Sequence, residues 1–77
     1  MTSYCIYAYS KKLDTYESMG VYGKEQDARL VAQALENLIG QGMLTYIYND
    51  FHEPFDSVEI RKYSNEDCIS TGDLVEI

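Results

Sequence analysis

Residue types that build active sites and metal centres are scarce in this chain: it has one histidine, two cysteines and no tryptophan. His52 lies far in sequence from both cysteines, so no nucleophile has an evident base within reach, and no Cys/His spacing typical of zinc occurs. Acidic residues surround His52, but they do not follow the pattern of a calcium loop. We therefore predict a protein without enzymatic activity, cofactor or metal.

Long apolar runs are missing as well. No segment approaches the roughly 20 apolar residues of a membrane helix, and the N-terminus lacks the basic region and apolar stretch of a secretory signal. Cys5 and Cys68 are then expected to be free thiols of a reducing compartment. We expect a cytoplasmic protein that does not bind membranes.

Basic residues are few, at six against 13 acids, which gives a formal net charge of −7. The imbalance is uneven, because residues 50–77 hold eight of the acids and two of the bases and so carry −6 of that charge. Such a half repels phosphate and attracts basic surfaces. We therefore expect no direct binding of nucleic acid, and a protein partner with a basic surface is favoured.

Tyrosine, in contrast, is abundant, with eight tyrosines and two phenylalanines. The run Tyr4-Cys5-Ile6-Tyr7-Ala8-Tyr9 alternates with period two, which is typical of a half-buried strand. Strands of this kind are expected over residues 3–10, 15–22, 43–48 and 56–63. The inward-pointing side chains of these strands would be Ile6, Met19, Val21, Ile47, Val58 and Ile60. Gly20, inside the second strand, marks a bulge or a close approach of another backbone.

One amphipathic helix is expected over residues 24–39, where apolar side chains recur at the spacing of one helical face and Leu30 and Ala34 widen the stripe. Gly23 is a plausible N-cap, and Gly40 or Gly42 would end the helix in the left-handed conformation. Residues 49–55 and 64–72 are expected to be irregular, and residues 74–77 form either a short fifth strand or a docking tail.

These elements predict a single α+β domain over residues 1–77, a two-layer ββαββ fold with a mostly antiparallel four-stranded sheet. The strand order 2-1-3-4 fits two hairpins joined by the helix. Because the helix covers only one sheet face, no regular element is left to cover the other. The expected phase places seven tyrosines on that second face, and only Tyr4 inward. The seven are Tyr7, Tyr9, Tyr16, Tyr22, Tyr46, Tyr48 and Tyr63.

This tyrosine face has several interpretations. Tyrosine is a strong strand former, and cross-strand aromatic pairs stabilise sheets, so the rings are either purely structural or lie under the C-terminal tail. They also suit a protein interface, self-association included, because tyrosine combines a large rigid contact area with a polar tip. A small ligand such as a sugar is a third option. Stacking of single-stranded RNA is disfavoured, because the basic surround it normally has is absent.

The acids of the C-terminal half have two interpretations: a solvated surface that keeps a small protein soluble, or a patch complementary to a basic groove. At alternate positions of one strand, or on neighbouring strands, carboxylates lie roughly 5–7 Å apart, comparable to phosphates along a nucleic-acid strand. The acids assigned to this candidate patch are Asp50, Glu53, Asp56, Glu59, Glu66 and Asp67.

The leading hypothesis is a non-enzymatic module that docks on another protein, with tyrosines as anchors and acids that steer the encounter. In size and charge alone, the chain is similar to small acidic inhibitors of nucleic-acid-processing enzymes, including phage anti-CRISPR and anti-restriction proteins, although no motif of such a family is present. The alternative is a structural protein that forms a homodimer through its tyrosine face.

Overall fold

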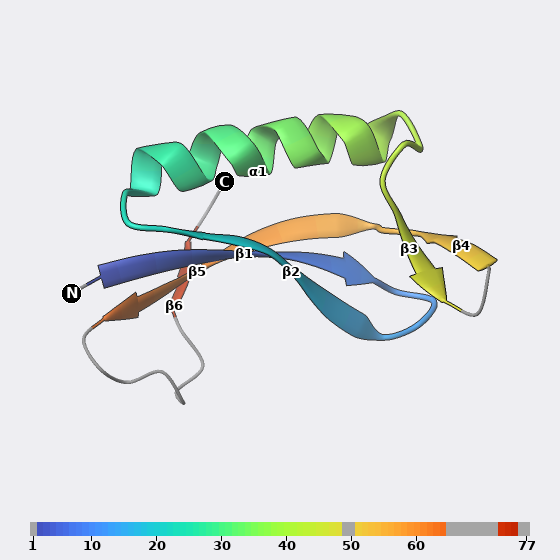
Figure 1. The fold of residues 1–77 in the computed structure, drawn as a ribbon, viewed down its shortest axis with the longest axis horizontal. Coiled ribbons are helices and arrows are strands. Elements are labelled where there is room, and N and C mark those ends of the chain that lie inside the picture. The colour runs from blue at the N-terminus through green and yellow to red at the C-terminus, as the bar shows by residue number, and fades with distance from the viewer. Residues whose placement is uncertain (1, 49–50, 65–72, 76–77) are drawn as a thin grey trace.

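The computed structural model describes residues 2–48, 51–64 and 73–75. In this part of the chain, one helix lies along one face of an antiparallel four-stranded sheet, which confirms the predicted two-layer α+β fold (Figure 1). The elements are β1 (Thr2–Ser10), β2 (Thr15–Tyr22), α1 (Glu25–Gly40), β3 (Thr45–Tyr48), β4 (Phe51–Pro54), β5 (Ser57–Ser64) and β6 (Asp73–Val75).

The strand order is β2-β1-β5-β6, which differs from the order expected from two hairpins joined by the helix. β3 does not enter the main sheet but pairs with β4 in a separate two-stranded sheet, so the connection predicted to be irregular contains a strand. Only two residues separate β3 from β4 in sequence, so their pairing is local. β6 takes the edge position beside β5, as the strand alternative for the C-terminal segment predicted.

A bulge between β1 and β2 changes which side chains point toward the helix. Ile6 pairs with Gly20 and Tyr7 with Ser18, so Met19 is an extra residue in β2. An extra residue shifts the alternation of all side chains beyond it. Tyr22 consequently packs against the core, and Val21 is 62% exposed. The predicted outward position of Tyr22 and the inward position of Val21 are therefore wrong, whereas Met19 points inward as predicted.

The hydrophobic core lies between α1 and the sheet. The fully buried core residues of the helix are alanines, so α1 can approach β1 and β5 closely. The buried cluster consists of Ile6, Ala28, Ala32, Val58 and Ile60, as the periodicities predicted. Leu30 and Ala34 do not widen the buried stripe, since both are exposed on the outer side of α1. No helix in the described residues is long and apolar enough to span a membrane.

The ends of α1 differ from each other in how they are capped. Lys24, not Gly23, occupies the N-cap position, with no side-chain capping bond. At the other end Gly42 has φ of 70° and Gly40 is still helical. The Met43 N–H donates to the Leu38 carbonyl oxygen, and the Gly42 N–H donates to that of Ile39, each at 2.9 Å. This pair of bonds is a Schellman motif, in which glycine removes the Cβ strain of a left-handed residue.

Candidate functional site

The sheet face turned away from α1 is the candidate site, and we call it the open face. In β1, Ile6, Ala8 and Ser10 are buried toward α1, so the residues between them point the other way. Because directly paired residues share a face, the strand registers extend this assignment to the neighbouring strands. The open face consists of Ser3, Cys5, Tyr7, Tyr9, Tyr16, Ser18, Val21, Ser57, Glu59, Arg61, Tyr63 and Leu74.

Four of the seven tyrosines assigned to one surface meet on the open face: Tyr7, Tyr9, Tyr16 and Tyr63. Tyr22 packs on the opposite side because of the bulge, and Tyr4 also packs against the core, as predicted. The backbone of Tyr46 and Tyr48 belongs to β3 in the second sheet, which contradicts their placement in a single sheet. Their side chains lie outside the described part of the structure.

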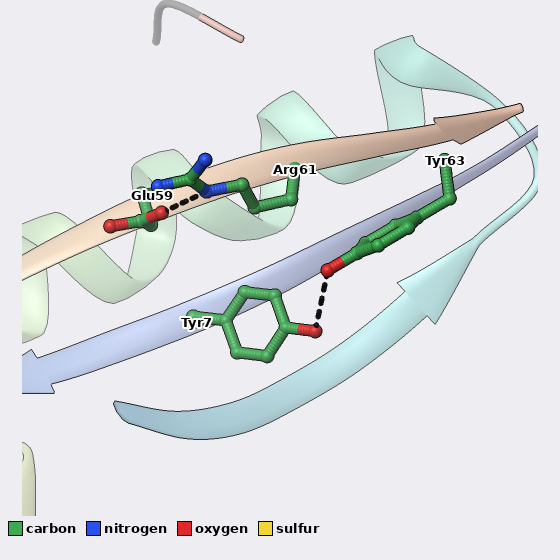
Figure 2. A network of polar contacts seen from close by, with 4 residues as sticks. All are labelled: Tyr7, Glu59, Arg61 and Tyr63. Carbon is green, nitrogen blue, oxygen red and sulfur yellow. Dashed lines mark hydrogen bonds and ion pairs between the residues drawn. The ribbon is translucent and has the colours of Figure 1, made fainter. Parts of the chain in front are cut away.

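Tyr7 and Tyr63 are joined at their phenol tips. The two hydroxyl oxygens are 3.3 Å apart, and either one can be the donor (Figure 2). Tyr7 comes from β1 and Tyr63 from β5, so the contact links the two central strands across the open face. The hydrogen bond to Tyr63 raises the pKa of Tyr7 above its ordinary value, and partial burial adds to the effect. The Tyr7 phenol is therefore neutral at physiological pH.

Tyr9 and Tyr16 form a second aromatic pair. They are directly opposite in β1 and β2, and their ring centroids are 4.7 Å apart with the planes inclined by 38°. The Tyr9 hydroxyl donates a hydrogen bond of 2.9 Å to Oδ1 of Asp14 in the turn between the strands. This bond raises the pKa of Tyr9. Tyr16 is 53% exposed, so part of this pair's aromatic area faces solvent.

Glu59 and Arg61 occupy alternate positions of β5 and so point to the same face. The Nε–H of Arg61 donates to Oε2 of Glu59 (Figure 2). The carboxylate raises the pKa of the guanidinium. Both side chains are partly covered, at 32% exposure for Arg61 and 21% for Glu59. The open face thus has a charge pair whose net charge is zero.

A hollow of about 210 Å³ lies on the open face. Three phenol rings and the charge pair line it: Tyr7, Tyr16, Tyr63, Glu59 and Arg61. Sequence reasoning assigned four of these residues to a partner-binding surface but missed Arg61. The signal was present, because Arg61 is two residues from both Glu59 and Tyr63 and therefore shares their strand face.

The predicted acidic patch is not a row of bare carboxylates. Glu53 forms an ion pair with Lys12, with Oε1 and Nζ 3.2 Å apart. Asp56 accepts the backbone N–H of Lys11 at 2.6 Å, and Glu59 is paired with Arg61. These three acids of the set thus have local partners. Asp50, Glu66 and Asp67 lie outside the described residues.

The lone histidine and the cysteine on the open face give no metal site in the described residues, which contain no group of three or more candidate ligands. The Nδ1 atom of His52 is 3.3 Å from the hydroxyl of Thr45. Cys5 is a half-buried free thiol on the open face, and Cys68 lies outside the described residues.

Comparison with known proteins leaves the function to be argued from this geometry. No protein-family model matches the chain, and no significant match was found among curated proteins or solved structures.

Proposed function

We propose that this protein is a non-enzymatic binding module that docks on a partner protein through the open face. The observation that carries the proposal is the gathering of Tyr7, Tyr9, Tyr16 and Tyr63 on the sheet face opposite α1. Tyrosine and arginine are over-represented among the residues that dominate binding energies at protein interfaces. Rigid rings on a sheet also lose little conformational entropy when a partner binds.

The charges of the open face and of the whole chain indicate the chemistry of the partner. The open face has one neutral Glu59–Arg61 pair, so it does not repel either sign strongly at contact. The whole chain has a net charge of −7 and draws basic surfaces from a distance. We therefore infer a partner with a basic surface. The concrete form we propose is a cytoplasmic inhibitor that covers a nucleic-acid-binding surface, of the kind represented by phage anti-CRISPR and anti-restriction proteins.

Site-specific photo-crosslinking in a lysate of the native host tests this function. Ser18 is exposed on the open face, directly opposite Tyr7, and receives the crosslinker. Gln33 is exposed on α1, on the other side of the sheet, and receives it in the matched control. The expected result is one basic protein crosslinked from Ser18, not from Gln33, and reduced at high salt. An acidic partner, or equal crosslinking from both positions, would contradict the proposal.

Self-association is the alternative, and one feature of the open face favours it. Val21, Cys5, Arg61 and Leu74 form a row across all four strands, with an exposed apolar residue at each end. In a two-fold symmetric dimer, Glu59 of each copy could exchange its partner for Arg61 of the other copy. Light scattering at micromolar concentration decides between the two: a dimer that Tyr16→Ser dissociates supports self-association, and a monomer removes it.

A further inference from the structure

We propose that the hollow lined by Tyr7, Tyr16, Tyr63, Glu59 and Arg61 is the anchor subsite of the open face, and that it takes an arginine side chain of the partner. The inference rests on the proposed docking function and specifies the group that is recognised. At about 210 Å³ the hollow is below the roughly 300–1,000 Å³ of pockets for drug-sized ligands. Its size therefore suits one side chain better than a whole small molecule.

The walls of the hollow suit a flat cation. Three phenol rings line it from three strands, and an aromatic face attracts a cation within about 6 Å of its centroid. The hydroxyls of Tyr7 and Tyr63 use one proton in their mutual bond, so their oxygens still have lone pairs for guanidinium N–H donors. A guanidinium can stack on the rings and donate at its edge at the same time, which an ammonium group cannot do.

Glu59 supplies the charge that an incoming cation requires. Its side chain is 21% exposed, and Oε2 of its carboxylate accepts the Nε–H of Arg61 (Figure 2). Oε1 does not take part in that bond, and a carboxylate accepts several hydrogen bonds at once. The guanidinium of Arg61 thus already lies against Glu59 in the wall of the hollow, and Oε1 is the acceptor we assign to the incoming group.

Arg61 repels an incoming cation, and this repulsion predicts the direction in which removal of Arg61 changes the affinity. It neutralises Glu59 and places a like charge beside the guest. Removing Arg61 should therefore strengthen the binding of a cation. If the hollow instead recognised an anion such as a carboxylate, Arg61 would be its main donor, and removing it would weaken binding.

The experiment is an NMR titration of protein with ¹³C-labelled tyrosine rings, using N-acetyl-arginine methylamide as the probe. The citrulline analogue, which is neutral and nearly isosteric, is the control ligand. We expect the arginine probe to shift the ring signals of Tyr7, Tyr16 and Tyr63 but not that of Tyr22, which packs against the core. The free energy of one exposed ion pair corresponds to a few-fold difference in affinity between a ligand that forms the pair and one that cannot. The citrulline probe should therefore bind about threefold more weakly or worse.

Three variants provide the decisive comparison. Glu59→Gln should weaken binding of the arginine probe about threefold, and Arg61→Met should strengthen it about threefold. Lys62→Met is the matched control, because Lys62 pairs with Tyr4 on the opposite face and its removal changes the net charge equally. It should leave the affinity nearly unchanged. Backbone NMR spectra show whether each variant retains the fold.

The remaining outcomes overturn the inference. Weaker binding in Arg61→Met together with stronger binding in Glu59→Gln would make the hollow an anion site. Equal affinity for the arginine and citrulline probes would make it a site for a neutral group. Absence of any ring shift would leave no subsite in the hollow. If any of these results occurred together with specific crosslinking from Ser18, the proposed docking function would stand and only the arginine subsite would be rejected.

Discussion

The tyrosines of the open face differ in the groups to which their hydroxyls are hydrogen-bonded. Tyr7 is bonded to another phenol, whereas Tyr9 donates to the carboxylate of Asp14. Both bonds favour the protonated phenol, so the pKa of each tyrosine is raised. A neutral phenol keeps the aromatic surface free of extra negative charge in a chain that is already strongly acidic.

Replacing Tyr63 by Phe tests the contact between the phenol tips. The substitution removes the hydroxyl that raises the pKa of Tyr7 and retains the ring, so the pKa of Tyr7 should fall toward its ordinary value. The pKa of Tyr9 should not change, because its partner is Asp14. NMR titration of ¹³C-labelled tyrosine rings follows both. An unchanged pKa of Tyr7 would mean that the hydrogen bond to the Tyr63 hydroxyl does not stabilise the protonated form of Tyr7.

The same shift predicts how stability depends on pH. The folded protein holds the Tyr7 proton more tightly than the unfolded chain, whose tyrosines titrate near pH 10. The stabilisation is thus fully present below about pH 10 and is lost as the pH rises toward the folded pKa of Tyr7. The Tyr63→Phe variant should lose less stability over this alkaline range than the unmodified protein, as urea denaturation at increasing pH would measure.

At the scale of elements, the bulge in β2 decides which face each side chain joins. Gly20 has φ of 148°, a backbone conformation that residues with a Cβ rarely adopt. The ring of Tyr22 lies close to it, because a Cβ built at Gly20 would be 3.0 Å from the Cε2 of Tyr22. The bulge turns Tyr22 toward the core, and the missing side chain of Gly20 leaves room for its ring.

Gly20→Ala should therefore destabilise the protein by about 2 kcal/mol, since it adds backbone strain and displaces the Tyr22 ring. Gly40→Ala is the matched control, because Gly40 is helical and a Cβ there meets nothing within 4 Å. The control should stabilise the protein by about 0.5–1 kcal/mol. Urea denaturation gives both values. Equal stabilities for the two variants would show that the bulge does not require glycine.

Periodicity in the sequence predicted most elements, and Gly20 indicated a bulge or a close backbone approach, but the change of face that the bulge causes was not predicted. Helix α1 and strands β1, β2 and β5 were located to within about two residues, because their apolar residues recur at the period of the element. The alternation in β2 shows no break at Met19, so sequence reasoning continued it to Tyr22 and assigned that side chain to the wrong face. A bulge depends on the register with the partner strand, and that register is not a local property of the sequence.

At the scale of the whole molecule, net charge and contact surface have separate roles. Glu53 and Glu59 of the predicted acidic patch are paired with Lys12 and Arg61, while the chain as a whole has a charge of −7. Long-range attraction to a basic partner then depends on the total charge, and residence time depends on the rings that are buried at contact. The two contributions can be separated by kinetics.

We expect that replacing Glu59 and Glu66 by Gln and Asp67 by Asn slows association with the crosslinked partner several-fold at low salt and flattens its salt dependence. Tyr7→Ser combined with Tyr16→Ser should instead mainly accelerate dissociation, because ring area is lost at contact. Surface plasmon resonance at increasing salt measures both rates. Association of the unmodified protein that does not depend on salt would refute the steering role of the acids.

The sequence by itself determined the acidic character, the abundance of tyrosine, the amphipathic helix and the two-layer α+β class, because composition does not depend on folding and periodicity is a local property. Only the tertiary structure decided that four tyrosines share the open face, that Tyr22 does not, and that Arg61 joins Tyr7 and Tyr63 around one hollow. These arrangements arise from strand pairings between residues up to 62 positions apart, such as Thr2 with Ser64. Such pairings are set by packing of the whole chain, and no local pattern encodes them.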